Sequence, residues 1–210
     1  MPSTITSSRP FEPGTTGWTV HDLDDPEIEQ QWVNGRYEIV EGVLTTMPPA
    51  YFVGGNALFN LLHRIKSHLE QTGQAGRFAT ELDVVVDDDR VARSDAAMLT
   101  PADEARQAEA AKAAKPQRDA TRVRILVPPT LVIEALSPGH EQHDLKTKKR
   151  WYAEFGVPNY WVLDAYAKSL QCMVLDGGTY RTERTAQGAD VAQSQLFPGL
   201  VLPLTRVWED

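Results

Sequence analysis

One strand–helix–strand segment near the middle of the chain constrains its fold more than any other. The apolar run Leu131–Leu136 predicts a buried strand. Apolar residues at helical spacing then predict a helix that Asp144 caps and that extends through Phe155, with Gly156 ending it. Tyr160–Leu163 predicts the next strand. Such a succession requires a sheet with a helix packed against it.

Two charged residues of this segment occupy positions that are otherwise apolar. Glu134 lies in the middle of the first strand. Lys148 lies on the apolar stripe of the helix, which is formed by Leu145, Trp151, Tyr152 and Phe155. Because burying an unpaired charge is costly, we expect Glu134 and Lys148 to form a catalytic pair or a structural ion pair. The alternative is that Lys148 lies at the edge of the stripe, with its stem packed against the apolar residues and its ammonium in water.

Weaker patterns predict the remaining elements. The predicted helices are a short one between Trp18 and Trp32, capped by Asp24 or Asp25, and a long one from a cap at Asn56 to Gly73. The predicted strands are two within 36–47 around a turn at Glu41-Gly42, and then 77–79, 82–86, 93–99, 170–175 and 179–184. Strands and helices do not alternate strictly, so we expect an α/β (α+β) fold with a mixed β-sheet flanked by helices.

The chain has the length and composition of one domain. Its 210 residues, 41% of them hydrophobic, suffice for one core. Residues 1–17 are rich in Ser, Thr, Pro and Gly and predict a flexible N-terminal tail, which leaves 18–210 as the domain. Residues 102–128 predict an insertion, either a solvated helix or a mobile loop, with a lid or substrate-contacting arm as the alternative. The segment 197–208 is apolar enough to pack on the domain.

Charge and apolar content exclude some classes of protein. A net charge of −8 argues against tight, nonspecific coating of nucleic acid, although an enzyme with a local basic patch stays compatible with it. No apolar run approaches the roughly 18 residues that a membrane span needs. Residues 1–10 lack an apolar signal core, and Cys172 has no second cysteine with which to form a disulfide. These features predict a cytoplasmic protein without membrane contact, in which Cys172 is a buried bystander.

Asp95 is a third candidate site residue, because it is a lone carboxylate entering an apolar strand. Alone it means little, since strand ends often carry Asp. With Glu134 it could hold Mg²⁺ or Mn²⁺, because such hard cations prefer oxygen ligands and need only one or two carboxylates. A lysine nearby could orient or help deprotonate an attacking water, or stabilise developing negative charge. The histidine pairs 140/143 and 63/68 have poor spacing for zinc.

Several motifs resemble those of one known family. They are Arg36–Leu44, Arg93–Asp95 with Ser94 in place of a proline, Val132–Pro138 followed by Asp144, Lys148 and Tyr152, and Gly156–Asp164. Over roughly residues 18–203 the chain is similar to the Uma-type family of putative restriction endonucleases, which has a PD-(D/E)XK nuclease-like fold.

The resemblance implies a restriction-endonuclease-like core with extra antiparallel strands, and a metal-dependent endonuclease that hydrolyses phosphodiester bonds of DNA. Asp95 and Glu134 would bind Mg²⁺ or Mn²⁺. The wider superfamily has its lysine two residues after the second acid, where this chain has Leu136, so the resemblance places it at Lys148. Glu38 matches an upstream acid that would complete the site; an exposed strand glutamate is the alternative.

The sequence also leaves two questions open. The alternative function is a catalytically silent nuclease-fold module that binds or regulates a partner, which the acidic charge favours. The apolar residues 161–163 and the C-terminal segment could also serve a homodimer.

Overall fold

The computed structural model describes residues 9–49, 51–113 and 124–209. Within them, the main sheet has eight strands in the order β2-β1-β4-β5-β6-β7-β8, with β3 also paired to β4. The strands are β1 (Tyr37–Val40), β2 (Val43–Thr46), β3 (Arg77–Asp87), β4 (Arg90–Leu99), β5 (Leu131–Ala135), β6 (Asn159–Asp164), β7 (Ser169–Asp176) and β8 (Thr179–Gln187). β5 and β6 run parallel, whereas β4 pairs with β5 and β6 with β7 antiparallel. The predicted mixed sheet is confirmed.

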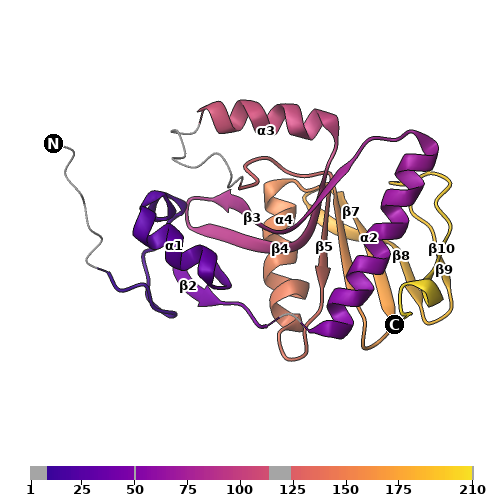
Figure 1. Ribbon diagram of the computed structural model, residues 1–210, viewed down its shortest axis with the longest axis horizontal. Coiled ribbons are helices and arrows are strands. Elements are labelled where there is room, and N and C mark those ends of the chain that lie inside the picture. The colour runs from indigo at the N-terminus through magenta and orange to yellow at the C-terminus, as the bar shows by residue number, and fades with distance from the viewer. Residues whose placement is uncertain (1–8, 50, 114–123, 210) are drawn as a thin grey trace.

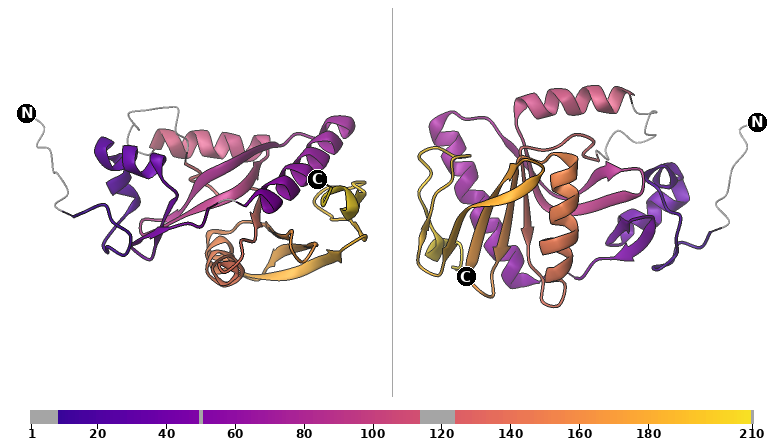
Figure 2. Two further views of the ribbon diagram at one scale, coloured as in Figure 1. Left: turned by 60° about the horizontal axis from the view of Figure 1, so that its bottom comes forward. Right: turned by 180° about the vertical axis from the view of Figure 1, so that it is seen from behind.

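Helices cover both faces of this sheet (Figures 1 and 2). They are α1 (Pro26–Asn34), α2 (Phe52–Thr72), α3 (Pro101–Ala113), a π-helix η2 (His143–Lys148) and α4 (Lys149–Phe155), which continues η2. Short 3₁₀ helices η1 (Val20–Asp24) and η3 (Leu204–Arg206) and a small sheet of β9 (Val191–Ala192) and β10 (Leu202–Pro203) complete the described elements. The predicted α+β class is confirmed.

The alternation of side chains along β5 decides which residues reach the site. Ile133 packs with Leu61 and Ile65 of α2 on one face of the sheet. Val132 packs with Trp151 and Tyr152 of α4 on the other. Because successive residues of a strand point to opposite faces, Glu134 lies on the same face as Val132 and is directed at the helix that carries Lys148.

Several predicted boundaries are confirmed. The Asp25 carboxylate accepts a hydrogen bond from the Glu27 amide and caps α1. The turn at Glu41-Gly42 joins β1 to β2. Gly73 ends α2 and Gly156 ends α4, the latter at φ 89°, a left-handed conformation that glycine adopts without steric cost.

Three local predictions were wrong. Asn56 does not cap α2, which begins at Phe52; its side chain donates to the Glu209 carbonyl instead. Asp144 lies inside the helical segment and not at its cap, which is Gln142. The strands predicted at 77–79 and 82–86 are one strand, β3, although Glu81 between them has a positive φ of 55°. For Asn56, a tertiary contact outweighs the local preference.

The N-terminal segment packs on the domain from Arg9 onward. The Gly14 amide donates to the Leu44 carbonyl, and Thr16 forms a bridge with Val43. Arg9 lies 2.8 Å from the Asp22 carboxylate. The predicted flexible tail therefore does not extend to residue 17, because these backbone groups add to the edge of β2; residues 1–8 lie outside the described part.

The first part of the predicted insertion at 102–128 is helical and forms most of α3, which agrees with the expectation of a helix. The Gln107 side chain donates to the Arg124 carbonyl and accepts from the Leu126 amide. Ile125 is buried and pairs with Val84 of β3. Residues 114–123 lie outside the described part of the chain.

The remaining apolar candidates belong to the core. Trp161, Val162 and Leu163 are at most 4% exposed, so they are not available to a homodimer. The C-terminal segment packs as predicted, with Phe197 and Leu204 buried. Cys172 is buried in β7, and burial raises the pKa of its thiol. No helix in the described ranges is both long and apolar enough to cross a membrane.

Candidate active site

The antiparallel pairing of β4 with β5 brings two candidate carboxylates together. Ala96 is opposite Ile133, and the next residues along the two strands are Asp95 and Glu134. The Ala135 amide donates to Asp95 Oδ2 at 2.7 Å, and the Asp95 amide lies 3.4 Å from Glu134 Oε2. The two acids thus lie side by side, with Glu134 fully buried and Asp95 partly exposed.

Lys148 is buried beneath these strands, so the expectation of an ammonium close to Glu134 is confirmed and the alternative of a solvated ammonium is wrong. Its Nζ lies 3.0 Å from Glu38 Oε1, 3.3 Å from Glu134 Oε2 and 3.4 Å from Asp144 Oδ1. It also donates to the Arg93 carbonyl at 3.0 Å. Four acceptors therefore surround the three protons of one ammonium.

Glu38 connects three elements and is not an exposed strand glutamate. It is 2% exposed. Its Oε1 accepts from the Arg93 amide at 2.9 Å as well as from Lys148. Its Oε2 lies 2.7 Å from Nε2 of His143.

The π-helix explains why three side chains of one short segment reach the same place. In η2 the hydrogen bonds run from residue i to i+5, a wider turn than that of an α-helix. Residues 143, 144 and 148 then share a face, whereas in an α-helix residues five apart diverge. His143 reaches Glu38, and Asp144 reaches Lys148, from this face.

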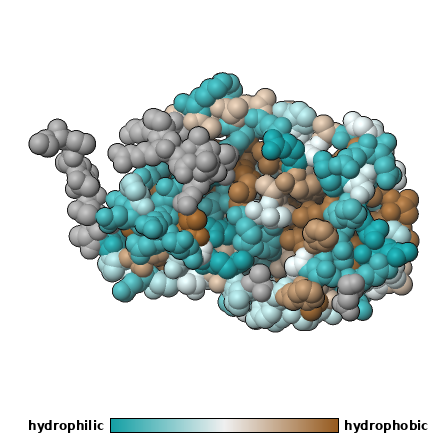
Figure 3. All heavy atoms as spheres, viewed as in Figure 1, coloured by the Kyte–Doolittle hydropathy of each residue, from teal (hydrophilic) through white to brown (hydrophobic). Residues whose placement is uncertain are grey.

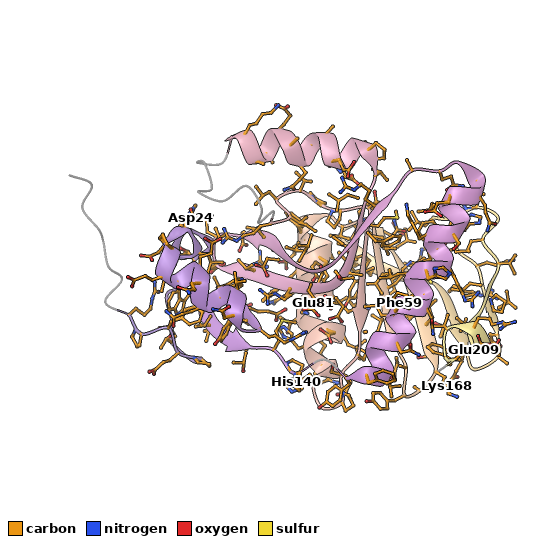
Figure 4. The ribbon with its side chains drawn as sticks, viewed as in Figure 1. Asp24, Phe59, Glu81, His140, Lys168 and Glu209 are labelled. Carbon is orange, nitrogen blue, oxygen red and sulfur yellow. The ribbon has the colours of Figure 1, made fainter. Side chains whose placement is uncertain are left out.

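These residues line one cavity of about 310 Å³. Its charged and polar lining includes Arg36, Glu38, Thr45, Thr46, Glu81, Asp95, Glu134, Ser137, His140, His143, Asp144 and Lys148. Figure 4 labels two of them, Glu81 from β3 and His140 from the loop that precedes η2. Leu58 of α2 and Tyr51, which precedes that helix, also line the cavity. Hydrophobic side chains gather over α2 in the space-filling view (Figure 3).

Burial and charge shift the protonation equilibria of the site. Burial alone would lower the pKa of Lys148, but Glu134, Glu38 and Asp144 raise it well above its usual range, so the ammonium stays protonated. Burial raises the pKa of Glu134 well above its usual range, although Lys148 opposes this and Asp95 adds to it. Burial also raises the pKa of Asp144. Glu38 differs: its burial is outweighed by Lys148 and His143, which lower its pKa to about 2.

The donor set fits a hard divalent cation. Glu38, Glu81, Asp95, Glu134 and Asp144 outnumber the two cations of the lining, Arg36 and Lys148. Burial, with the neighbouring carboxylates adding to it, raises the pKa of Glu134 and of Asp144. No three His, Cys, Asp or Glu side chains within residues 9–49, 51–113 and 124–209 are arranged to hold one ion. A cation here would use Asp95 and Glu134 and complete its shell with water, as Mg²⁺ often does.

Comparison with known proteins supplies a family. A family model, Uma2, described as "Putative restriction endonuclease", matches residues 26–205. The chain belongs to the Uma2 family. A crystal structure of a putative nuclease from Anabaena variabilis ATCC 29413 is similar to it, with a TM-score of 0.62, 16% identity, and coverage of 83% of this chain and 90% of that one. At this identity the likeness shows a shared, nuclease-like fold. No curated protein matches the chain.

The Uma2 match includes the whole candidate site, and membership in this family supports a nuclease acting on nucleic acid. The structure brings together all four residues that the sequence singled out: Glu38, Asp95, Glu134 and Lys148. His143 and Asp144 were missed as site residues. Asp144 lies four residues before Lys148, a spacing that places both on one face of any helix. His143 lies five residues before Lys148, which places both on one face only if the helix is a π-helix.

The low pKa of Glu38 predicts an acid dependence of stability in this Uma2 protein. Its folded pKa of about 2 lies below the unfolded value of 4.5, so its stabilisation is present above pH 4.5 and is lost as pH falls toward 2. The full effect is about 3 kcal/mol, of which about 2 kcal/mol disappears between about pH 5 and pH 3. Urea unfolding at a series of pH values should show this loss in the wild type and not in Glu38→Gln.

Glu70→Gln, on the surface of α2, is the matched control for loss of one charge. The same acid slope in Glu38→Gln as in the wild type would contradict an ionised, buried Glu38.

Proposed function

We propose that the chain is a metal-dependent endonuclease that hydrolyses phosphodiester bonds of DNA. The observation that carries this proposal is the convergence of Asp95, Glu134 and Lys148 on one cavity. Family membership supports the nuclease class. The excess of carboxylates over cations in the cavity supports the use of a divalent ion.

Each residue has a role that follows from its surroundings. Asp95 and Glu134 would hold Mg²⁺ or Mn²⁺, which when bound supplies Lewis-acid polarisation of a phosphoryl oxygen. Tyr152 donates to Glu134 Oε1 at 2.8 Å and fixes the orientation of that carboxylate. Lys148 acts as a fixed positive charge: it keeps the acids together and stabilises negative charge that develops on the phosphate.

Glu38 has a supporting role in this proposal. It accepts from the Lys148 ammonium and from the Arg93 amide, and so joins β1 to the β4 strand that carries Asp95. Its carboxylate, 3.0 Å from the Lys148 Nζ, orients that ammonium.

Metal removal tests the proposal. Purified protein should convert supercoiled plasmid to nicked or linear DNA with Mg²⁺ or Mn²⁺, because the carboxylate pair needs a cation to act on an anionic phosphate. Excess chelator should abolish cleavage, and excess Mg²⁺ should restore it.

A single-stranded oligonucleotide and an RNA of the same sequence, assayed in parallel, identify the preferred nucleic acid. Cleavage that persists in chelator would contradict the metal role. Metal binding without cleavage of any of these substrates would favour the silent binding module.

A further inference from the structure

Hydrolysis requires a group that accepts a proton from the attacking water, and Lys148 does not have this capacity. Its ammonium is occupied by Glu38, Glu134, Asp144 and the Arg93 carbonyl. A protonated amine that donates in every direction has no lone pair to offer. A general base supplied by the chain would therefore be another residue of the cavity.

His143 has the position that such a residue needs. It lines the cavity, and its side chain is 29% exposed. Glu38 holds its Nε2 at 2.7 Å, and the edge of the ring meets Trp151, so the imidazole is fixed from two sides. Its Nδ1 has no hydrogen-bond partner in the part of the chain that the structure describes.

The charge of Glu38 decides which nitrogen of His143 carries the proton in the neutral ring. With its pKa near 2, Glu38 is ionised at neutral pH and can only accept hydrogen bonds. Nε2 therefore donates, and Nδ1 keeps its lone pair. A carboxylate, an oriented imidazole and a free ring nitrogen form the arrangement by which a histidine acts as a general base.

We propose that His143 is the general base of the hydrolysis and that Glu38 is its positioning residue, an inference that rests on the proposed nuclease function. The oxygen of a water molecule forms a bond to phosphorus as its proton passes to Nδ1 of His143. The bond from phosphorus to the leaving oxygen breaks, and that oxygen takes a proton from solvent. The imidazolium is stabilised by the Glu38 carboxylate and returns its proton to solvent.

Other charged and titratable groups line the same cavity as His143. They are Glu38 of β1, Asp144 and Lys148 of its own helix, His140 of the preceding loop, Arg36 before β1, and Asp95, Glu134 and Glu81. Asp144 is the nearest rival as a base, but its carboxylate is bound to Lys148 and is largely buried. His143 differs from it in having a free nitrogen and access to the cavity.

Substitution of His143 tests the role. His143→Gln keeps an amide that can donate to Glu38 but cannot accept a proton, so we expect kcat to fall by about 10²- to 10⁴-fold with KM little changed. In His143→Ala, added imidazole should restore part of the cleavage. His63→Gln and His63→Ala, on the exposed surface of α2, are the matched controls and should behave as the wild type does.

Nitrogen NMR of the histidine side chains gives a readout that does not depend on cleavage. The neutral ring of His143 should carry its proton on Nε2, and Glu38→Gln should disturb this preference. A proton on Nδ1 would overturn the inference. Equal cleavage by the wild type and His143→Gln would overturn it while the nuclease function stands. A wild type that cleaves no nucleic acid would overturn the proposed function and the inference with it.

Discussion

Lys148→Met should lower the free energy of unfolding by about 3–5 kcal/mol, because it removes one partner of a buried ion-pair network. Glu38, Glu134 and Asp144 would then face one another without the ammonium that now lies within 3.4 Å of each. Methionine nearly matches the volume of the lysine stem, so the loss reflects charge and not a cavity. Urea unfolding near neutral pH measures it. The deficit should shrink as the pH falls, since the carboxylates can then be neutralised by protons.

Two companion variants separate this effect from a general cost of substitution. Lys146→Met changes an exposed lysine of the same helix and should alter stability by no more than about 0.5 kcal/mol. Adding Glu134→Gln to Lys148→Met should recover part of the loss, with a coupling energy of about 0.5–3 kcal/mol. If Lys148→Met and the wild type have the same urea midpoint of unfolding, the ammonium does not hold these carboxylates together.

Asp95→Asn should abolish most cleavage while leaving the fold intact. The amide oxygen can still accept from the Ala135 amide, which now donates to Asp95 Oδ2 at 2.7 Å. The other carboxylate oxygen, Oδ1, has no partner among the described residues and is the atom free to bind an ion. Losing Lewis-acid stabilisation worth several kcal/mol corresponds to a decrease of about 10³-fold or more in kcat.

The matched control for Asp95→Asn is Asp176→Asn, an exposed acid at the turn between β7 and β8. It should cleave DNA at the wild-type rate. Thermal unfolding of both variants checks that neither substitution disturbs folding. Retention of wild-type cleavage by Asp95→Asn would remove Asp95 from the active site.

The sequence predicted those parts of the site that local patterns determine. Glu134 stood out because a strand of apolar residues has no ordinary place for a carboxylate, and the structure buries it completely. Lys148 stood out because helical spacing placed it on the stripe that Trp151 and Tyr152 form, and all three are buried. Both inferences needed only the period of a strand or a helix.

The parts that the sequence did not predict depend on tertiary contacts. A π-helix has no periodicity that six residues can reveal, so His143, five residues before Lys148, could not be aligned with it beforehand. Arg9 and Phe11 belong to a segment without periodicity, yet they pack on Trp18. Asn56 is a good capping residue by type, but its side chain bonds to the C-terminal segment, which is distant in sequence.

Calorimetric titration of Mg²⁺ into the wild type and Asp95→Asn, with plasmid cleavage assayed on the same samples, tests the active-site assignment most directly. The wild type should bind the ion and cleave the plasmid, whereas Asp95→Asn should do neither and unfold at the wild-type temperature within a few degrees. A wild type that binds neither Mg²⁺ nor Mn²⁺ would contradict the metal site and leave Glu134 and Lys148 as a structural ion pair.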